Sequence, residues 1–344
     1  MIAAPKPDLI DFRDAILRRR EPRRVHHFEH GVAIEVQEAL RQKHGLSNTP
    51  RRDEPTMEQW DAEADIFAGL GFELFRVWLP GAEFPIAGSK GITWGEEHEG
   101  PIQSAQDLDR FDWPDPRNID SSQLEYYEKQ LPEGMGTFHV VKIWEVVREL
   151  IGFESFCFKS VEEPELVEEL TRRVGRFHVK LVELLCSFDR VEAVYATDDY
   201  GFKTSTMLSP QQIRELFLPW HRRIAEIAHR NGKLFLFHSC GKVDPLMDDL
   251  IDDVGIDAKH SFEDAVVPVT EAKRRWGDRV ALLGGLDVDL VARRGVEEIV
   301  DRTRELLEIC QPGGGYCLGL GNWVTSYIPP EHYEAVLETG YAFR

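Results

Sequence analysis

The chain has 344 residues, of which 42% are hydrophobic, and 61 Asp and Glu against 41 Lys and Arg give a formal net charge of −20. This length and apolar content suffice for a large core, and one α/β barrel domain often reaches this size. The acidic balance makes nucleic acid and anionic membrane surfaces unfavourable partners.

The cysteine content and the N-terminal sequence bear on the compartment. Five cysteines, an odd number without paired spacing, argue against a disulfide framework and fit a reducing environment. The first residues contain no apolar signal core, and no segment approaches the ~18 apolar residues of a membrane span. We therefore expect a cytoplasmic protein.

Short apolar runs predict eight β-strands, most of them separated by amphipathic helical patterns. The predicted strands cover residues 23–29, 72–79, 137–143, 192–197, 233–238, 256–261, 279–285 and 314–320. Eight strands that alternate with helices favour a single (β/α)8 TIM barrel domain over residues 1–344.

Helical patterns are clearest in three segments. Residues 165–185 repeat apolar side chains at three- and four-residue steps, residues 209–232 begin at a Ser cap and close on Gly232, and residues 296–309 end before a Pro-Gly pair. The rhythm breaks between residues 80 and 132, which are rich in Gly, Pro, Trp and acids. We expect a long loop insertion there that helps to build the walls of the active site.

Polar residues collect at the C-terminal ends of the predicted strands, where the loops of a barrel converge on one pocket. In chain order these residues are Trp144 and Glu145, Asp198, Asp199 and Tyr200, His238 and Cys240, His260 and Glu263, Asp287, and Asn322 and Trp323. The recurrence of this pattern at six strand ends indicates an active site.

His238 and Cys240 form the most specific pair. They lie two residues apart where the chain leaves a predicted strand, so both side chains can turn toward one point. One imidazole and one thiolate suit Zn²⁺. The alternative is a buried His bonded to the backbone beside an inert Cys, and the two residues alone favour neither reading.

Asp198 and Asp199 are the second feature. Adjacent acids on a strand point to opposite faces, so one can face the pocket while the other caps the next helix or binds an Arg. A pocket carboxylate would donate a proton, anchor an N–H group or bind a metal. The alternative is a solvated turn, but the preceding strand is otherwise apolar, which favours a functional role.

Aromatic and histidine residues add weaker candidates. We expect Trp144, Tyr200, His260 and Trp323 to line a substrate pocket, although aromatic residues are often ordinary core. The His-rich segment 26–30 could face the pocket at the end of the first strand, although a lone His is more often structural.

Several segments together resemble the uroporphyrinogen decarboxylase superfamily over nearly the whole chain, in matching order and spacing. They are HEGPI followed by DLDRFDWPDP, then WEVVRELIGFE, ATDDYGFKTSTMLSPQQIRELFLPWHRRI, FHSCGKVDPLMDDLIDDVGIDAKHS, RVALLGGLDVD and GGGYCLGLGN. The resemblance implies a single (β/α)8 barrel and one of two chemistries. Decarboxylases of this superfamily form coproporphyrinogen without a cofactor, whereas their zinc-dependent relatives move methyl groups between methylated substrates, corrinoid proteins and thiols such as coenzyme M.

Two departures from the decarboxylases distinguish these chemistries. Their Arg-rich N-terminal motif is replaced by EPRRVHHFEHG, and Asn322 stands where their final strand motif has a His. A substrate with eight carboxylates needs a cationic pocket. In this chain Arg23, Arg24, Arg76 and Lys142 would have to rebuild such a pocket from new positions.

The methyltransferase branch uses His-x-Cys and a later Cys as zinc ligands. His238 and Cys240 match, Asn322 aligns with the later Cys, and Cys317 lies five residues earlier. The resemblance therefore leaves the remaining ligands open among Cys317, Glu263, His260 and Asp199.

The favoured interpretation is a zinc-dependent methyltransferase of a corrinoid-linked demethylation system. Its zinc would activate a small-molecule methyl donor or a thiol acceptor, a corrinoid protein would be its partner, and Asp198, Asp199 or Asn322 would act on the substrate. The alternative is a decarboxylase that acts without metal. A binding protein without enzymatic activity is the third possibility.

Overall fold

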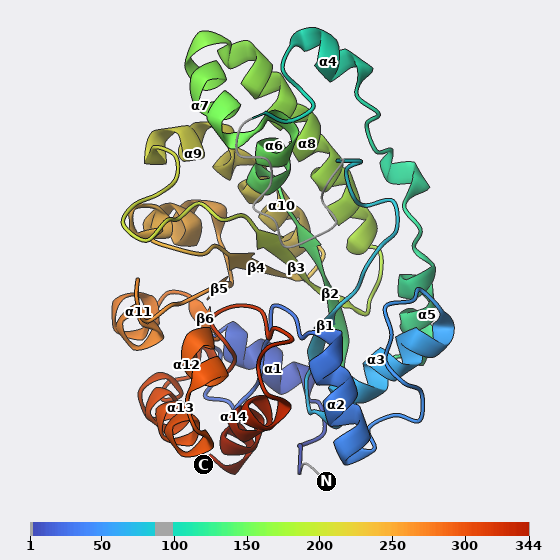
Figure 1. Cartoon of the computed structure of the whole chain (residues 1–344), viewed down its shortest axis with the longest axis vertical. Helices are drawn as coiled ribbons and strands as arrows, with labels where there is room; N and C mark the ends of the chain where they lie inside the picture. The colour runs from blue at the N-terminus through green and yellow to red at the C-terminus, as the bar shows by residue number, and fades with distance from the viewer. Residues whose placement is uncertain (1–2, 87–98, 344) are drawn as a thin grey trace.

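The computed structural model describes residues 3–86 and 99–343 and contains one parallel sheet of seven strands in the order β1 to β7. The strands are β1 (Leu74–Arg76), β2 (Gly136–Val141), β3 (Val191–Thr197), β4 (Leu234–His238), β5 (Ala258–His260), β6 (Ala281–Leu283) and β7 (Tyr316–Cys317). Each overlaps a predicted strand. The sheet curls, with helices outside it (Figure 1).

The first predicted strand, residues 23–29, is reduced to a single bridge. His27 pairs in parallel with Leu318, Phe28 N–H donates to the Leu318 carbonyl at 2.9 Å, and Leu318 N–H donates to His26 at 2.8 Å. Among the described residues no bridge joins this segment to β1. The structure thus confirms the α/β class and a half-barrel of seven parallel strands, and the described part of the chain forms no eighth strand.

The interior of the curled sheet is apolar. One cluster combines inward side chains from all seven strands with Phe28 from residues 23–29. Helix α1 (Leu9–Ile16) adds Phe12 and Ile16 to it, while Arg13 contacts Glu192 and the Gly232 carbonyl at the starts of β3 and β4. This helix therefore covers the N-terminal end of the strands and leaves the C-terminal end for the site.

Helices form the outer layer (Figure 1). The larger ones are α2 (Ile34–His44), α3 (Met57–Gly69), α6 (Trp144–Ile151), α7 (Phe153–Glu162), α8 (Pro164–Leu185), α9 (Pro210–Leu216), α10 (Leu218–Arg230), α11 (Val269–Trp276), α12 (Val288–Arg293), α13 (Val296–Cys310) and α14 (Pro330–Ala342). The helix predicted over residues 209–232 begins at a Ser209 capping box, as expected, but divides at Phe217, next to Pro219.

The expected insertion at residues 80–132 is partly helical. It contains α4 (Ala105–Arg110) and α5 (Ser122–Gln130), and its residues 87–98 lie outside the described part of the chain. Gln103 donates to the Ile151 carbonyl, and Arg173 donates to the Leu108 carbonyl. These bonds attach the insertion to the C-terminal end of α6 and to the middle of α8.

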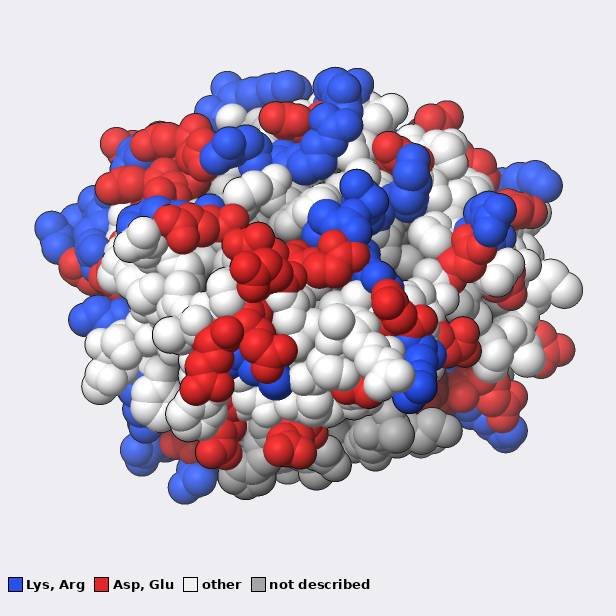
Figure 2. Space-filling view, turned by 90° about the horizontal axis from the view of Figure 1, so that it is seen from above, with Lys and Arg blue, Asp and Glu red and all other residues white. Residues whose placement is uncertain are grey.

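Charged groups are mixed on the surface. On the face shown in Figure 2, Lys and Arg side chains lie beside Asp and Glu side chains. Among the described helices, none is long and apolar enough to cross a membrane.

Candidate metal centre

Three potential metal ligands meet at the C-terminal ends of β3 and β4. His238 ends β4, Cys240 follows two residues later, and Asp199 lies two residues beyond β3. One ligand atom from each lies within 4.8 Å of the others. His238 Nε2 is 3.3 Å from Cys240 Sγ and 3.4 Å from Asp199 Oδ1. We call these three residues the donor group.

The spacing of the donor group fits a small tetrahedral ion. Zinc bonds of about 2.0–2.3 Å place neighbouring tetrahedral ligands roughly 3.3–3.7 Å apart. Both distances from His238 Nε2 fall in or near this interval. One nitrogen, one sulfur and one carboxylate oxygen are all accepted zinc ligands, so the residues present fit zinc.

Two glycines hold the loops that carry the donor group. A Cβ atom on Gly201 would lie 2.5 Å from the Cys240 carbonyl oxygen, and one on Gly241 would lie 2.3 Å from the Gly201 carbonyl carbon. Gly241 also has φ of 71°, which side-chain-bearing residues rarely adopt. The loops after β3 and β4 therefore touch through their backbones, which fixes Asp199 relative to Cys240.

A hydrogen-bond relay sets the tautomer of His238. His260 Nε2 lies 3.0 Å from the Leu320 carbonyl, which can only accept, so this nitrogen carries a proton. Burial lowers the pKa of His260 well below its usual value, so its ring is neutral and its Nδ1 accepts. His238 Nδ1, 2.7 Å away, must then donate. His238 Nε2 is left with a free lone pair that faces the rest of the donor group.

This relay corrects one expectation. His260 was expected in the substrate pocket or as a further ligand, but it is completely buried and both of its ring nitrogens are occupied. Its position is behind His238, where it supports the ligand.

The sequence analysis indicated His30 only as part of the His-rich segment 26–30. Its ring stacks on His238 with centroids 4.6 Å apart, and Trp323 meets its edge at 5.5 Å. Its neighbours in the His-rich segment lie elsewhere: His26 bonds to Asp11 and Glu73, and His27 packs against Tyr341. The alternation of side chains along an extended segment separates His30 from His27.

The two adjacent aspartates have different roles. Asp198 is completely buried, accepts from the backbone N–H groups of Ile143 and Glu145, and pairs with His221 at 3.0 Å. It therefore holds the start of α6. Asp199 accepts from Cys240 N–H at 2.7 Å.

Asn322 contacts the donor group through Cys240. Its side-chain nitrogen donates to Cys240 Sγ at 3.3 Å, and its oxygen accepts from Trp323 N–H at 2.8 Å. Cys317, the predicted third ligand, is instead part of the apolar interior cluster and pairs through the backbone with Leu283. Its direction follows from alternation along β7, so it does not join the donor group.

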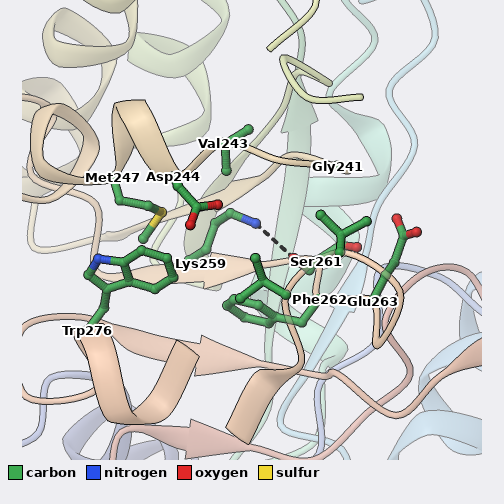
Figure 3. Close-up of a pocket in the computed structure, with 11 residues that line it drawn as sticks. Gly241, Val243, Asp244, Met247, Lys259, Ser261, Phe262, Glu263 and Trp276 are labelled. Atoms are coloured by element: carbon green, nitrogen blue, oxygen red, sulfur yellow. Dashed lines mark hydrogen bonds between the residues drawn. The ribbon is translucent and has the colours of Figure 1, made fainter. Parts of the chain in front are cut away.

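Glu263, the other predicted ligand, also lies outside the donor group. Figure 3 shows its carboxylate turned away from Lys259 in the loop that follows β5. Its charge still acts on the centre: burial, followed by the charges of Asp199 and Glu263, raises the pKa of Cys240 well above its usual value. Without a cation the thiol therefore stays protonated.

Lys259 ties the ends of β4 and β5 together beside a small cavity of about 20 Å³ (Figure 3). Its ammonium donates to the carbonyls of Ser239, His260 and Ser261 at 2.9–3.0 Å. Burial lowers the pKa of Lys259 to about 8. The sequence analysis did not single out this residue, because a Lys within a strand carries no motif.

Two aromatic residues expected in the pocket wall are instead core. Trp144 is completely buried, packs on Phe156 and Phe217, and donates to the Asp199 carbonyl at 3.1 Å. Tyr200 is also completely buried, with its hydroxyl 2.9 Å from His221 Nε2. Both therefore pack against the buried side of the loop that carries Asp198 and Asp199.

Besides the small cavity at Lys259, three larger cavities lined by described residues open around the C-terminal ends of the strands. One of about 350 Å³ is bordered by His30, Arg76, Trp78 and Trp323. A second of about 330 Å³ shares Arg76 and Trp78 with it and extends to Lys142. The third, about 1110 Å³, is a groove whose lining includes Glu263, Asn322, Trp323 and Tyr327. Trp323 thus lines two of these cavities.

Comparison with known proteins places these features in context. Residues 99–343 match the protein family described as uroporphyrinogen decarboxylase (URO-D). The uroporphyrinogen decarboxylase of Methylococcus capsulatus is 28% identical over 271 residues, covering 72% of each chain. The methylated-thiol–coenzyme M methyltransferase of Methanosarcina mazei is 35% identical over 164 residues, covering 47% of this chain and 42% of that protein.

Two solved structures superpose on most of this chain and therefore have a similar fold. A methyltransferase from Methanosarcina mazei superposes with a TM-score of 0.68 over 97% of this chain and 98% of that chain, at 17% identity. A putative vitamin-B12 independent methionine synthase from Listeria monocytogenes gives 0.51 over 91% and 93%, at 12% identity. At these identities the likeness concerns the fold alone.

Proposed function

The chain belongs to the uroporphyrinogen decarboxylase family, and we propose that it is a methyltransferase whose zinc ion is held by Asp199, His238 and Cys240. The observation that carries this proposal is the donor group, in which His238 Nε2 presents a lone pair within 3.4 Å of both other ligand atoms. The similarity to a methylated-thiol methyltransferase supports the same reaction class.

Bound zinc would supply Lewis acidity that favours the thiolate form of a coordinated thiol. The chain's own residues would do the rest. His260 keeps Nε2 of His238 unprotonated, and Asn322 donates to the Cys240 sulfur, which is a bond that stabilises the thiolate. Trp323 and His30 form the wall beside the donor group.

The substrates would be a small methylated molecule and a thiol, with a corrinoid protein as carrier. The groove of about 1110 Å³ is lined by Asn322, which contacts Cys240, so a partner bound there would lie close to the donor group. Exposed aromatic side chains at its rim, such as Tyr327, suit a transient contact.

The second candidate is a decarboxylase that acts without metal. The family description and the relative from Methylococcus capsulatus favour it. The positions of Arg23 and Arg24 count against it, whereas Arg76 and Lys142 do line cavities at the C-terminal ends of the strands. Arg23 pairs with Asp8 and Asp11, and Arg24 pairs with Glu73, at the end of the sheet covered by α1. Neither borders the cavities around the donor group.

We also propose that residues 26–28 act as the eighth position of a single (β/α)8 barrel. Phe28 shares the interior cluster with all seven strands, and the bridge to Leu318 places its segment beside β7. The segment forms a single bridge and no full strand, but in this role it would close the apolar interior from that side.

Metal analysis tests the proposed function. Protein purified without added zinc should contain about one zinc per chain, and the double change His238→Ala with Cys240→Ala should abolish it. The matched control is His229→Ala with Cys157→Ala, because this His and Cys lie away from the donor group. Zinc-loaded protein should also transfer a methyl group from a methylated thiol. Repeated purification without metal, with no binding of added zinc, would falsify the proposal.

An assay with uroporphyrinogen III under anaerobic conditions tests the second candidate. We expect no efficient turnover, because fixed cations must hold the remaining carboxylates of the substrate during each decarboxylation. Steady formation of coproporphyrinogen at about 1 per second or faster would restore the decarboxylase reading.

A further inference from the structure

Lys259 is a buried cation that contacts the loop carrying Cys240. Its ammonium donates to the carbonyl oxygens of Ser239, His260 and Ser261 at 2.9–3.0 Å, and Figure 3 shows the bond to Ser261. Three acceptors use all three N–H bonds of an ammonium, so the nitrogen keeps no lone pair and is charged. A buried charge is unfavourable unless its bonds replace the lost hydration, and here backbone carbonyls at the ends of β4 and β5 replace it.

The ammonium joins β4 and β5 where their backbone pairing stops. The last backbone bond between the two strand ends runs from Ser239 N–H to the His260 carbonyl at 2.8 Å. In the described part of the chain, Lys259 is the only residue that donates to the Ser239 carbonyl. The ring of Phe262, 4.8 Å from the ammonium, packs against this junction. A side chain therefore takes over the role of the next bond in the ladder.

One peptide unit connects Lys259 to the donor group. The carbonyl oxygen of Ser239 and the N–H of Cys240 belong to the same peptide unit. Lys259 donates to its oxygen at 3.0 Å, and its N–H donates to Asp199 Oδ1 at 2.7 Å. A cation on the oxygen polarises the peptide and strengthens the bond that its N–H donates. Ammonium, peptide and carboxylate thus form one chain of hydrogen bonds that ends at a proposed ligand.

The residue between the other two proposed ligands is fixed on three sides. Ser239 donates through its N–H to His260 and accepts at its carbonyl from Lys259, while its hydroxyl accepts from Tyr200 N–H at 2.9 Å. Only the contact with Lys259 involves a charge. Its loss would release the carbonyl side of the peptide that precedes Cys240, while the other two contacts remain.

We propose that Lys259 is a positioning residue of the donor group, which holds Cys240 against Asp199 through the peptide unit between Ser239 and Cys240 and thereby increases the affinity for zinc. This inference rests on the proposed function for the identity of the metal. Lys259 would touch neither the metal nor a substrate. Its ammonium also places a fixed positive charge near a centre that contains a carboxylate and a sulfur ligand.

The affinity for zinc tests this role. Lys259→Met keeps an unbranched side chain but removes the charge and all three donors, so the zinc Kd should rise about tenfold to a hundredfold. The matched control is Lys233→Met, just before the start of β4, because Lys233 is also buried and donates to two backbone carbonyls, those of Phe188 and Asp189. Its zinc Kd should equal that of wild type. An unchanged Kd in Lys259→Met would overturn the inference, whatever the stability of the variant.

A double-mutant cycle separates positioning from a general loss of stability. If Lys259 acts through the peptide that holds Asp199, its replacement should matter little once that carboxylate is absent. In an Asp199→Ala background, Lys259→Met should therefore raise the zinc Kd less than about threefold. An effect as large as in the wild-type background would show that Lys259 does not act through Asp199.

A measurement on wild type covers the case in which Lys259→Met does not fold. In protein labelled with ¹³C and ¹⁵N at lysine, the ammonium signal of Lys259 can be assigned through its side-chain carbons. Binding of zinc should shift this signal, because the hydrogen-bond chain connects the ammonium to Asp199. The ammonium signal of Lys233 should stay in place. A Lys259 signal that does not respond to bound zinc would contradict the inference.

The inference and the proposed function can fail separately. In metal-free protein, Lys259→Met should raise the rate at which iodoacetamide alkylates Cys240 at least about threefold, because the loop is no longer held, and Lys233→Met should not. Mass spectrometry of the Cys240 peptide measures this rate. A raised rate in a protein that never binds zinc would support the role of Lys259 and overturn the proposed function. Equal zinc Kd values for wild type and Lys259→Met would overturn the role of Lys259 alone.

Discussion

The Nδ1 atoms of His238 and His260 lie 2.7 Å apart, and the Leu320 carbonyl determines which of them carries the shared proton. A backbone carbonyl cannot donate, so His260 must donate to Leu320 and accept from His238. The ligand nitrogen that faces Cys240 and Asp199 is therefore selected by a residue on the far side of β5.

Replacing His260 should weaken the metal site without removing a ligand. In His260→Phe the His238 ring loses the acceptor for its Nδ1 proton, and the zinc Kd should rise about tenfold to a hundredfold. His260→Asn, which can still accept, should recover part of this loss. Competition with a chromophoric chelator measures both values, and His229→Phe serves as the control. A zinc Kd that is unchanged in His260→Phe would show that the relay has no influence on the ligand.

Replacing Cys240 and replacing Cys317 should have different effects on zinc binding. Cys240→Ser should reduce bound zinc strongly, because it removes the sulfur ligand of the donor group. Cys317→Ala should retain full zinc content and lose only about 1 kcal/mol of stability through a small cavity in the interior cluster. Metal analysis and urea unfolding of both variants check this. Zinc loss in Cys317→Ala would restore Cys317 as a ligand.

Replacing Asp198 should mainly reduce stability, whereas replacing Asp199 should mainly reduce zinc binding. Asp198→Ala should lower the free energy of unfolding by about 3 kcal/mol, because it leaves His221 and the start of α6 without their buried partner. Asp199→Ala should unfold nearly as wild type but bind zinc more weakly. Denaturant titration and zinc content, measured on both variants, distinguish the roles. The same loss of stability in both would mean that the pair acts as one structural unit.

Lys259 should give a pH-dependent contribution to stability. Burial lowers its pKa to about 8 in the folded protein, while an unfolded Lys has a pKa of about 10.4. Between these values the unfolded chain binds more protons, so the stability of wild type rises with pH across this window. Relative to Lys259→Met, wild type should gain up to about 3 kcal/mol from pH 8 to pH 10.5. A difference that stays constant over this window would contradict a lowered pKa.

Gly201 should be required for the position of Cys240. Gly201→Ala places a Cβ 2.5 Å from the Cys240 carbonyl oxygen, so the loop after β4 must move. We expect weaker zinc binding and a lower Tm. Gly295→Ala, where nothing lies within 4 Å of the added atom, is the control and should change neither.

The fold was largely predictable, because apolar runs with turn residues between them marked all seven strands, from β1 at Leu74–Arg76 to β7 at Tyr316–Cys317. Residues 23–29 carry the same local pattern, but a strand also needs partners on its edges, and here only His27 has one. Local sequence cannot reveal that difference. The division of the helix at Phe217 likewise depends on tertiary packing as well as on Pro219.

The candidate site was partly predictable. His238 and Cys240 were identified from their spacing, and Asp199 only as one member of a pair. The choice of Asp199 over Asp198, and of Asn322 over Cys317, depends on which way side chains alternate at the strand ends. His30 was indicated only as part of the His-rich segment 26–30, because its place beside His238 and Trp323 depends on tertiary packing.

All three members of the donor group come from the neighbouring strands β3 and β4, within 42 residues of chain. The order of assembly follows from this. The proposed zinc site needs only these two neighbouring strands in the middle of the sheet, so zinc would bind before β6 and β7 have joined, and with lower affinity until β5 supplies His260. Zinc should then accelerate folding. Refolding followed by stopped-flow fluorescence should be faster with zinc present from the start than with zinc added at the end.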